Sequence, residues 1–138
     1  MDISAVTGID HVRLSDDGTA VVILDQTELP NRTVYLSLTE ADEMFDAILK
    51  LRVRGAPCIG IFAGYAMYVL ASRYSETEYS PFLEHFLADK QYLNSSRPTA
   101  VNLSWALQRM ESVVLSNSGK PVSEIIPLLK AESIDIIP

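Results

Sequence analysis

The stretch Thr33–Leu51, TVYLSLTEADEMFDAILKL, contains the change from strand to helix that decides the fold. Its first part, Thr33–Leu38, predicts a short strand. Thr39 is a favourable helix N-cap, and the acids in the following turn suit the positive end of a helix dipole. Apolar residues then recur at helical spacing, so we predict a helix from Thr39 to about Val53-Arg54-Gly55, where Gly55 can adopt the left-handed cap.

The residues before this stretch predict a β-hairpin. Val12 and Leu14 alternate with polar neighbours, and Ala20–Leu24 is a short apolar run. Between them lies Asp16-Asp17-Gly18-Thr19, a turn sequence in which Gly18 can supply a positive φ. The first third of the chain is therefore expected to be β-rich.

The rest of the chain predicts four further helices. They run from Pro57 to about Tyr74, from Pro81 to about Leu93, from Pro98 or Thr99 to beyond Val114, and from Pro121 onward, with Pro127 expected to kink or split the last one. A few strands followed by about five helices indicate an α+β fold, a small antiparallel β-sheet followed by a helical bundle. The length suits one domain, 1–138, that is β-rich to about residue 38 and helical from about residue 39.

The composition narrows the classes of function. The net charge of −7 argues against a nucleic-acid binder and against attraction to anionic membranes, so an anion site needs individually placed arginines. Cys58 is the single cysteine, which excludes an intrachain disulfide and fits a reducing compartment, the cytoplasm. The longest apolar stretch, Ala56–Ala71, is shorter than the ~20 residues that a spanning helix needs, and it predicts a buried helix.

Two arginines stand at predicted helix starts. In Arg54-Gly55-Ala56-Pro57, the small residues Gly55 and Ala56 let a ligand approach the backbone N–H groups at the helix start. In Ser95-Ser96-Arg97-Pro98-Thr99, two hydroxyls and Arg97 precede another helix. Unpaired N–H groups, the helix dipole and an arginine together favour phosphate. Each segment alone is also explained as a helix cap or turn with a solvated arginine, but the two can converge on one phosphate group.

The other candidate residues favour structural roles. Cys58 opens an apolar helix, where the dipole can lower a thiol pKa, but burial as a small apolar residue is the better interpretation. Trp105 lies beside the apolar stripe of its helix and is expected in the core. His11 and His85 have no cysteine or carboxylate at ligand spacing, so no metal site is predicted. Asp25-Gln26 is either a catalytic acid and amide or a strand-end turn.

Three segments of the chain resemble the methylthioribose-1-phosphate isomerase family. Leu24–Pro30, LDQTELP, is similar to its L-D-Q-x-x-L-P motif. Val53–Gly60, VRGAPCIG, is similar to V-R-G-A-P-A-I-G, with Cys58 in place of an alanine. Ser96–Leu107, SRPTAVNLSWAL, is similar to S-R-P-T-A-V-N-L-x-W-A-L. The order and spacing of the motifs agree as well, and the resemblance covers nearly the whole chain.

The resemblance implies an aldose–ketose isomerase that converts 5-methylthioribose 1-phosphate to 5-methylthioribulose 1-phosphate in methionine salvage, without a metal or nucleotide cofactor. It implies an N-terminal β-plus-helical domain paired with a Rossmann-like C-terminal domain, usually in a homodimer. By the same resemblance, Arg54, Gly55, Ala56 and Arg97 bind the phosphorylated pentose.

The resemblance also places the catalytic cysteine and aspartate in the C-terminal domain, and no residue of this chain corresponds to them. We therefore expect a substrate-binding N-terminal half that lacks the Rossmann-like domain and is inactive alone, whether as a fragment, a truncated form or part of a split enzyme. Three alternatives stay open. They are an isomerase for 5-deoxyribose 1-phosphate or ribose 1,5-bisphosphate, a non-catalytic protein like the alpha, beta and delta regulatory subunits of the translation initiation exchange factor, and a standalone interaction module.

Overall fold

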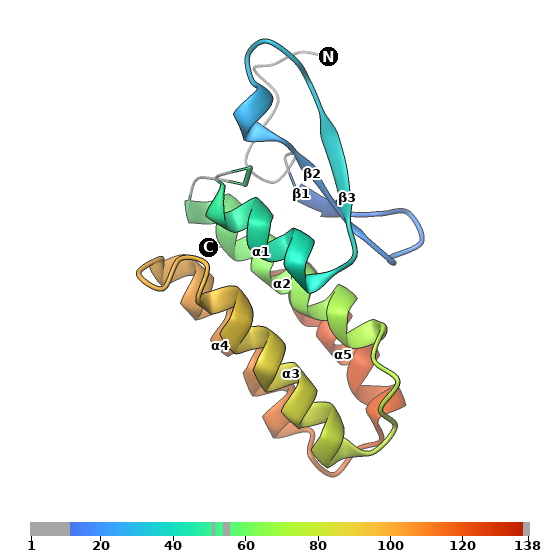
Figure 1. Cartoon of the computed structure of the whole chain (residues 1–138). Helices are drawn as coiled ribbons and strands as arrows, with labels where there is room; N and C mark the ends of the chain where they lie inside the picture. Colours follow the sequence, from blue (N-terminus) through green and yellow to red (C-terminus); the bar gives the residue numbers. More distant parts are fainter. Residues whose placement is uncertain (1–11, 51, 54–55, 137–138) are drawn as a thin grey trace.

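The computed structural model describes residues 12–50, 52–53 and 56–136, which form a three-stranded sheet and five α-helices. The elements are, in chain order, β1 (Val12–Leu14), β2 (Val21–Leu24), the 3-10 turn η2 (Gln26–Glu28), β3 (Tyr35–Leu38), α1 (Ala41–Leu49), α2 (Ala56–Ser72), α3 (Tyr79–Asn94), α4 (Val101–Ser116) and α5 (Val122–Asp135). The strands precede the helices, and the sheet lies at one end of the helical bundle (Figure 1). The predicted α+β class is confirmed.

The predicted hairpin is present, with its turn at the predicted residues. β1 and β2 pair antiparallel, with Val12 opposite Ile23. Gly18 has a φ of 74°, a left-handed conformation that glycine adopts without steric cost. The Asp17 carboxylate accepts a hydrogen bond from the backbone N–H of Thr19 at 3.1 Å and closes the turn.

Strand β2 is the centre of the sheet, and all four of its residues are buried. It pairs antiparallel with β3, with Val21 opposite Leu38 and Ile23 opposite Leu36. The third strand begins at Tyr35, slightly later than predicted, and the Tyr35 side chain is 52% exposed. The sheet therefore has a buried central strand, as its continuous apolar sequence indicates.

Helix α1 starts one residue later than predicted. The N-cap position is taken by Glu40 and not by Thr39, and the helix begins at Ala41. The Glu43 carboxylate accepts hydrogen bonds from the backbone N–H groups of Thr39 at 3.0 Å and of Glu40 at 3.1 Å. Glu43 thus satisfies N–H groups that the helix leaves unpaired, and this fixes the start.

The predicted end of α1 near Val53 is wrong, because the helix stops at Leu49. The chain then turns, and the backbone N–H of Arg52 donates to the carbonyl of Ala47 at 2.9 Å. The carbonyl of Arg52 accepts from the N–H of Gln26 at 2.9 Å. A contact with a turn far away in the sequence therefore competes with the last turn of the helix.

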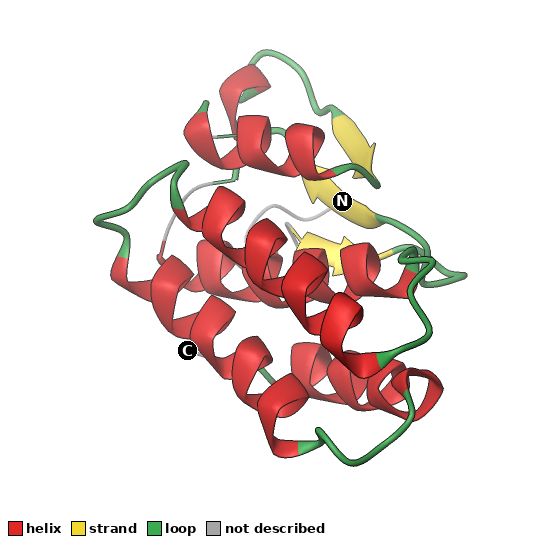
Figure 2. Cartoon of the chain, turned by 60° about the horizontal axis from the view of Figure 1, so that its bottom comes forward, coloured by secondary structure: helices red, strands yellow, loops and turns green. Residues whose placement is uncertain are grey.

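The long apolar helix α2 lies at the centre of the bundle and contacts the other four helices and strands β1 and β2. Figure 1 shows that α2 and α4 run in the same direction and begin at the end of the bundle nearest the sheet, while Figure 2 shows the strands gathered at one side of the helices. Gly64 faces the end of α5, where a Cβ atom would lie 3.5 Å from Cα of Ser133 and would require the side chain of Ile136 to shift, since its Cδ1 would be 2.5 Å away. The predicted buried helix over the Ala56–Ala71 stretch is confirmed.

Two details of the last helices differ from the sequence-based expectation. Helix α4 begins at Val101, after Pro98 and Thr99, which lie in the preceding turn. Helix α5 is continuous through Pro127 and is not split. Pro127 is exposed and lies in the second turn, so its missing N–H costs the helix one hydrogen bond at the surface.

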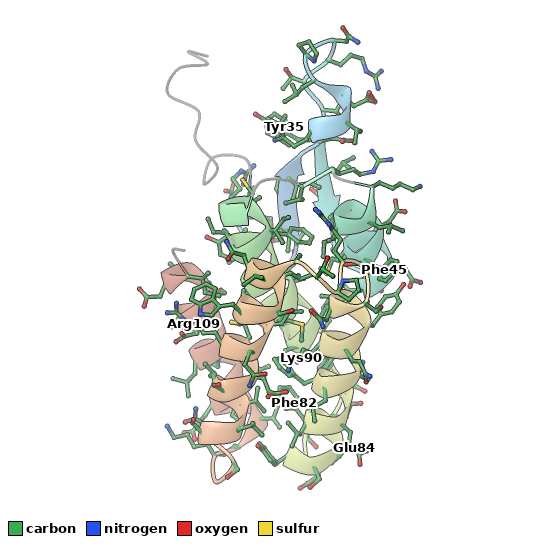
Figure 3. The ribbon with its side chains drawn as sticks, turned by 90° about the vertical axis from the view of Figure 1, so that its left-hand side faces the viewer. Tyr35, Phe45, Phe82, Glu84, Lys90 and Arg109 are labelled. Atoms are coloured by element: carbon green, nitrogen blue, oxygen red, sulfur yellow. The ribbon has the colours of Figure 1, made fainter. Side chains whose placement is uncertain are left out.

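Trp105 is 42% exposed, so its predicted place in the core is wrong. Leu103 and Leu107 point into the core, and Trp105, two positions from each, lies about 200° away around the helix. The guanidinium of Arg109 lies 5.6 Å from the centroid of the Trp105 ring. Arg109, labelled in Figure 3, also pairs with Glu132 of α5, so this face of α4 is held by polar contacts.

Candidate functional site

The four residues predicted to bind substrate are only partly covered by the structure. Arg54 and Gly55 lie outside the described residues, and Ala56 is the first residue of α2. Arg97 lies in the turn between α3 and α4 and is half-buried. Since α2 and α4 begin at the same end of the bundle (Figure 1), the fold brings the two predicted helix starts to one side of the molecule.

The turn that carries Arg97 is fixed by its own hydrogen bonds. The N–H of Ala100 donates to the carbonyl of Arg97 at 3.0 Å. The hydroxyl of Ser96 is buried and donates to the carbonyl of Leu93 at 2.6 Å, and the hydroxyl of Ser95 donates to α3 in the same way. The two hydroxyls therefore satisfy the end of α3, and the Arg97 side chain stays available for a ligand.

Helix α4 begins without a side-chain cap. Its N-cap residue, Ala100, has no group that can accept from the first helical N–H groups. Those N–H groups have no carbonyl of their own helix to bond, and they lie at the positive end of the helix dipole. A phosphate group at this start would satisfy them and would neutralise Arg97.

Arg97 forms no ion pair with any residue in the part of the chain that the structure describes, and Arg13, exposed on β1, shares this property. The other arginines of that part each pair with a carboxylate: Arg32 with Glu28, Arg52 with Asp25, Arg73 with Glu40 and Arg109 with Glu132. In an acidic chain, a half-buried arginine without a carboxylate partner is suited to an external anion.

Asp25 belongs to the turn that follows β2. Its buried carboxylate accepts from the N–H of Thr27 at 2.9 Å and from the Thr27 hydroxyl at 2.6 Å, and it forms an ion pair with Arg52. Burial alone would raise the pKa of Asp25, but the hydrogen bonds from Thr27 and Arg52 outweigh burial and lower that pKa. Asp25 is therefore a carboxylate held in its charged form. Of the two sequence-based readings, the strand-end turn is the one that the geometry supports.

Cys58 is buried in the first turn of α2, and burial raises the pKa of its thiol. A neutral, enclosed thiol is a poor nucleophile, so the structure favours the packing role.

His85 does have carboxylates nearby, which the sequence-based reading missed. Its Nδ1 lies 3.0 Å from the carboxylate of Glu76, and its Nε2 lies 3.7 Å from that of Asp89. The spacing of four residues between His85 and Asp89 on one helix was a signal in the sequence. Among the described residues, no group of three or more metal-binding side chains is placed to hold a metal ion.

Comparison with known proteins identifies relatives for most of the chain. Residues 52–136 match the Initiation factor 2 subunit family. Methylthioribose-1-phosphate isomerase of Symbiobacterium thermophilum is 47% identical over 125 residues, 91% of this chain and 35% of that protein. 5-Deoxyribose 1-phosphate isomerase of Clostridium botulinum is 42% identical over 88% of this chain and 35% of that protein. The crystal structure of 5-methylthioribose 1-phosphate isomerase from Pyrococcus horikoshii is 32% identical, with a TM-score of 0.86, over 91% of this chain and 35% of that chain.

This chain thus spans about a third of the length of the curated relatives that it matches. None of the described helices is long and apolar enough to cross a membrane. The family match covers more than half of the 138 residues, and the fold agrees with that of a solved relative. The chain belongs to the Initiation factor 2 subunit family.

Proposed function

We propose that this chain, residues 1–138, is the substrate-phosphate-binding N-terminal domain of an aldose–ketose isomerase that converts 5-methylthioribose 1-phosphate to 5-methylthioribulose 1-phosphate in methionine salvage. In this proposal a Rossmann-like C-terminal half supplies the catalytic groups, and the complete enzyme is a cytoplasmic homodimer. This chain alone binds the phosphate weakly and does not catalyse the reaction. No metal or cofactor takes part.

The observation that carries the proposal is the state of Arg97. Arg97 is half-buried as a residue, its guanidinium has no carboxylate partner among the described residues, and it precedes the uncapped start of α4. Arg54, Gly55 and Ala56 complete the proposed phosphate site from the start of α2, which lies at the same end of the bundle (Figure 1). The relatives named as sugar-phosphate isomerases support the same assignment.

A phosphate site without catalytic groups still contributes to isomerisation. The reaction opens the sugar ring and moves a proton between C1 and C2, and both steps need an acid–base pair placed beside these atoms. The phosphate on C1 does not react, so binding it fixes C1 and C2 relative to that pair. The N-terminal domain thus positions the substrate, and the C-terminal half carries out the proton transfer.

A second candidate substrate is 5-deoxyribose 1-phosphate, because the relative from Clostridium botulinum carries that name and is nearly as similar. Both sugars carry the phosphate on C1 and differ at C5, so the site at Arg97 suits either. A non-catalytic role like that of the initiation-factor subunits, which the family's description names, is less well supported, because this chain keeps both arginine motifs.

The test is an isomerase assay of this chain alone and mixed with a C-terminal half corresponding to the remaining length of the relatives. Each sample is given 5-methylthioribose 1-phosphate and, separately, 5-deoxyribose 1-phosphate. We expect activity in the mixture and none from the chain alone, with the larger kcat/KM for the methylthio sugar. A folded complex of the two halves that converts neither sugar would refute the proposal.

A further inference from the structure

The side chains of Asn94 and Ser104 join the two helices on either side of the turn that carries Arg97. Asn94 is the last residue of α3, and Ser104 lies in the first turn of α4. The Ser104 hydroxyl donates a partly buried hydrogen bond to Oδ1 of Asn94 at 2.8 Å. One contact between neutral side chains therefore closes the base of the turn, residues 95–100.

The backbone connects this contact to Arg97 on both sides. Toward α4, the N–H of Ser104 donates to the carbonyl of Ala100 at 3.2 Å, and the N–H of Ala100 donates to the carbonyl of Arg97 at 3.0 Å. Toward α3, only two residues separate Asn94 from Arg97, and the hydroxyls of both bond carbonyls of α3. A change in the spacing of Asn94 and Ser104 should therefore displace Arg97.

Other polar contacts join α3 and α4 away from this turn. The two helices lie side by side (Figure 1), and the Tyr79 hydroxyl at the start of α3 donates to the carbonyl of Val114 at 3.0 Å. Between these two ends, the Lys90 ammonium pairs with Glu111 at 2.9 Å. The helix pair is thus held in its middle and at its far end, and the contact between Asn94 and Ser104 acts on the end that carries Arg97.

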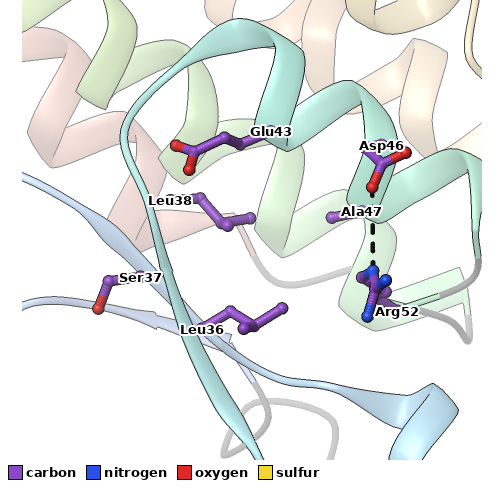
Figure 4. A pocket seen from close by; sticks show the side chains of 7 residues that line it. All are labelled: Leu36, Ser37, Leu38, Glu43, Asp46, Ala47 and Arg52. Atoms are coloured by element: carbon purple, nitrogen blue, oxygen red, sulfur yellow. Dashed lines mark ion pairs between the residues drawn. The ribbon is translucent and has the colours of Figure 1, made fainter.

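Arg97 is held in a different way from Arg52. Figure 4 shows Arg52 beside Asp46 at the edge of a hollow of about 320 Å³ between β3 and α1, with Nε of Arg52 4.0 Å from the Asp46 carboxylate. Arg52 also pairs with the buried carboxylate of Asp25. A carboxylate that positions a guanidinium also neutralises it and competes with a phosphate for its N–H groups. A contact between neutral side chains fixes a turn and leaves the charge of the arginine for a ligand.

We propose that Asn94 and Ser104 are positioning residues, which set the place of Arg97 for binding the substrate phosphate. This role rests on the proposed function and deepens it. The two side chains act through the backbone of the turn, and neither touches the reacting atoms. Ser104 occupies the variable position of the S-R-P-T-A-V-N-L-x-W-A-L motif, so the motif by itself assigns it no role.

The experiment uses the complete enzyme, this chain together with its C-terminal half, and compares Asn94→Ala, Ser104→Ala and the double variant. Ser104→Thr tests for rescue, because threonine keeps the hydroxyl. The matched control is Tyr79→Phe, which removes one partly buried hydrogen bond between the same two helices at the end away from Arg97. The readouts are kcat, KM for the sugar phosphate, the inhibition constant of inorganic phosphate and the urea midpoint of unfolding.

We expect Asn94→Ala and Ser104→Ala each to raise KM and the inhibition constant of inorganic phosphate about tenfold, since a misplaced binding group weakens a site. The value of kcat stays nearly unchanged, and the double variant shows the same tenfold effect, because both changes break one contact. Ser104→Thr keeps the parent constants. Tyr79→Phe lowers the urea midpoint and leaves all three constants unchanged. Multiplied effects in the double variant, or equal constants in Ser104→Ala and Tyr79→Phe, would overturn the proposal.

An Arg97→Ala variant separates the positioning role from the proposed function. Raised constants for Arg97→Ala with normal constants for the Asn94 and Ser104 variants refute the positioning role alone. Unchanged constants for Arg97→Ala refute phosphate binding by Arg97, and the positioning role falls with it. In the Arg97→Ala background, Ser104→Ala should have no further effect on KM, because its effect passes through Arg97. If Asn94→Ala does not fold, Ser104→Ala decides the question, because alanine is well tolerated within a helix.

Discussion

The two ends of the helical bundle carry polar side chains in opposite states. At the end where α2 and α4 begin (Figure 1), Arg97 precedes α4 and has no carboxylate partner among the described residues. At the other end, beyond the last turn of α2, the Tyr74 ring stacks on His85 with centroids 3.6 Å apart, and the Tyr74 hydroxyl donates to Asp89. The Glu76 carboxylate lies 3.0 Å from Nδ1 of His85.

The difference in pairing distinguishes side chains that stabilise the fold, such as Tyr74, from a side chain that can bind a ligand, such as Arg97. Burial and the hydrogen bond to Asp89 raise the pKa of Tyr74, so the phenol stays neutral and donates. Arg73, beside Tyr74 in the sequence, is neutralised by Glu40 at 2.8 Å. The charged residues around the last turn of α2 thus satisfy one another. The state of pairing, and not the number of charges, marks the candidate site.

Replacing one arginine at each end of the bundle tests this difference most directly. In the complete enzyme, Arg97→Ala should lower kcat/KM about a hundredfold, because two charge-assisted hydrogen bonds to phosphate contribute together about 3 kcal/mol. Its melting temperature should not change, since Arg97 holds no described carboxylate. Steady-state kinetics and a thermal melt measure both effects.

Arg73→Ala is the matched control for Arg97→Ala. It removes an exposed ion pair with Glu40, which contributes less than about 1 kcal/mol to the free energy of unfolding, and it should leave kcat/KM unchanged. Equal losses of activity in the two variants would show that overall positive charge, and not the place of Arg97, supports catalysis.

Removing the Tyr74 hydroxyl should lower the stability and leave the activity unchanged, which is the reverse of the effect expected for Arg97→Ala. Tyr74→Phe should lower the free energy of unfolding by about 1–2 kcal/mol, because it deletes a part-buried hydrogen bond to a charged acceptor. Substrate kinetics should stay as in the parent enzyme. Urea unfolding, followed by circular dichroism, measures the stability.

Tyr68→Phe provides the comparison for this variant. Tyr68 also lies on α2, and its hydroxyl forms no hydrogen bond with the other residues that the structure describes. It should change the stability by less than about 0.5 kcal/mol. A loss of substrate affinity in Tyr74→Phe, but not in Tyr68→Phe, would mean that the satisfied end of α2 also takes part in binding.

Unfolding at acid pH tests how much a paired charge stabilises the fold, because the buried carboxylate of Asp25 is paired inside the protein. Its pKa is lowered on folding, so its contribution to stability is present above the ordinary carboxyl pKa and is lost as pH falls through the folded value. The parent chain should therefore lose more stability between pH 5 and about pH 3 than Asp25→Asn does. Urea midpoints at the two pH values provide the measurement, and identical losses would contradict the lowered pKa.

Local sequence patterns predicted much of the fold. Gly18 marked the hairpin turn, and helical spacing marked every helix of the bundle to within a few residues. The errors had two causes, a distant contact for α1 and a misjudged helical angle for Trp105. Helix α1 ends early because Arg52 contacts Asp25, 27 residues away in the sequence. Trp105 was predicted in the core because it lies next to the apolar stripe of α4 in the sequence. Its position around the helix instead directs the side chain outward.

The candidate site was predictable only in part, for a related reason. The residue types around Arg97 indicated an anion site, but the sequence does not show which arginines are neutralised by carboxylates in the fold. It also gave no sign that Ser95 and Ser96 satisfy the end of α3 and are not ligand donors. The pairing of Asp25 with Arg52 is likewise encoded by no local pattern.

The smallest expected effect comes from Cys58, which lies at the same helix start as the proposed site but is buried. Burial raises the pKa of its thiol, so at neutral pH it is a small apolar group and not a thiolate. Cys58→Ala should leave kcat/KM unchanged and should cost about 1 kcal/mol or less, since it deletes one buried atom. The native thiol should also react slowly with a disulfide reagent and quickly after unfolding. Rapid labelling of the native chain together with complete inactivation of a folded Cys58→Ala enzyme would place a reactive group at the start of α2, which would then do more than hold a phosphate.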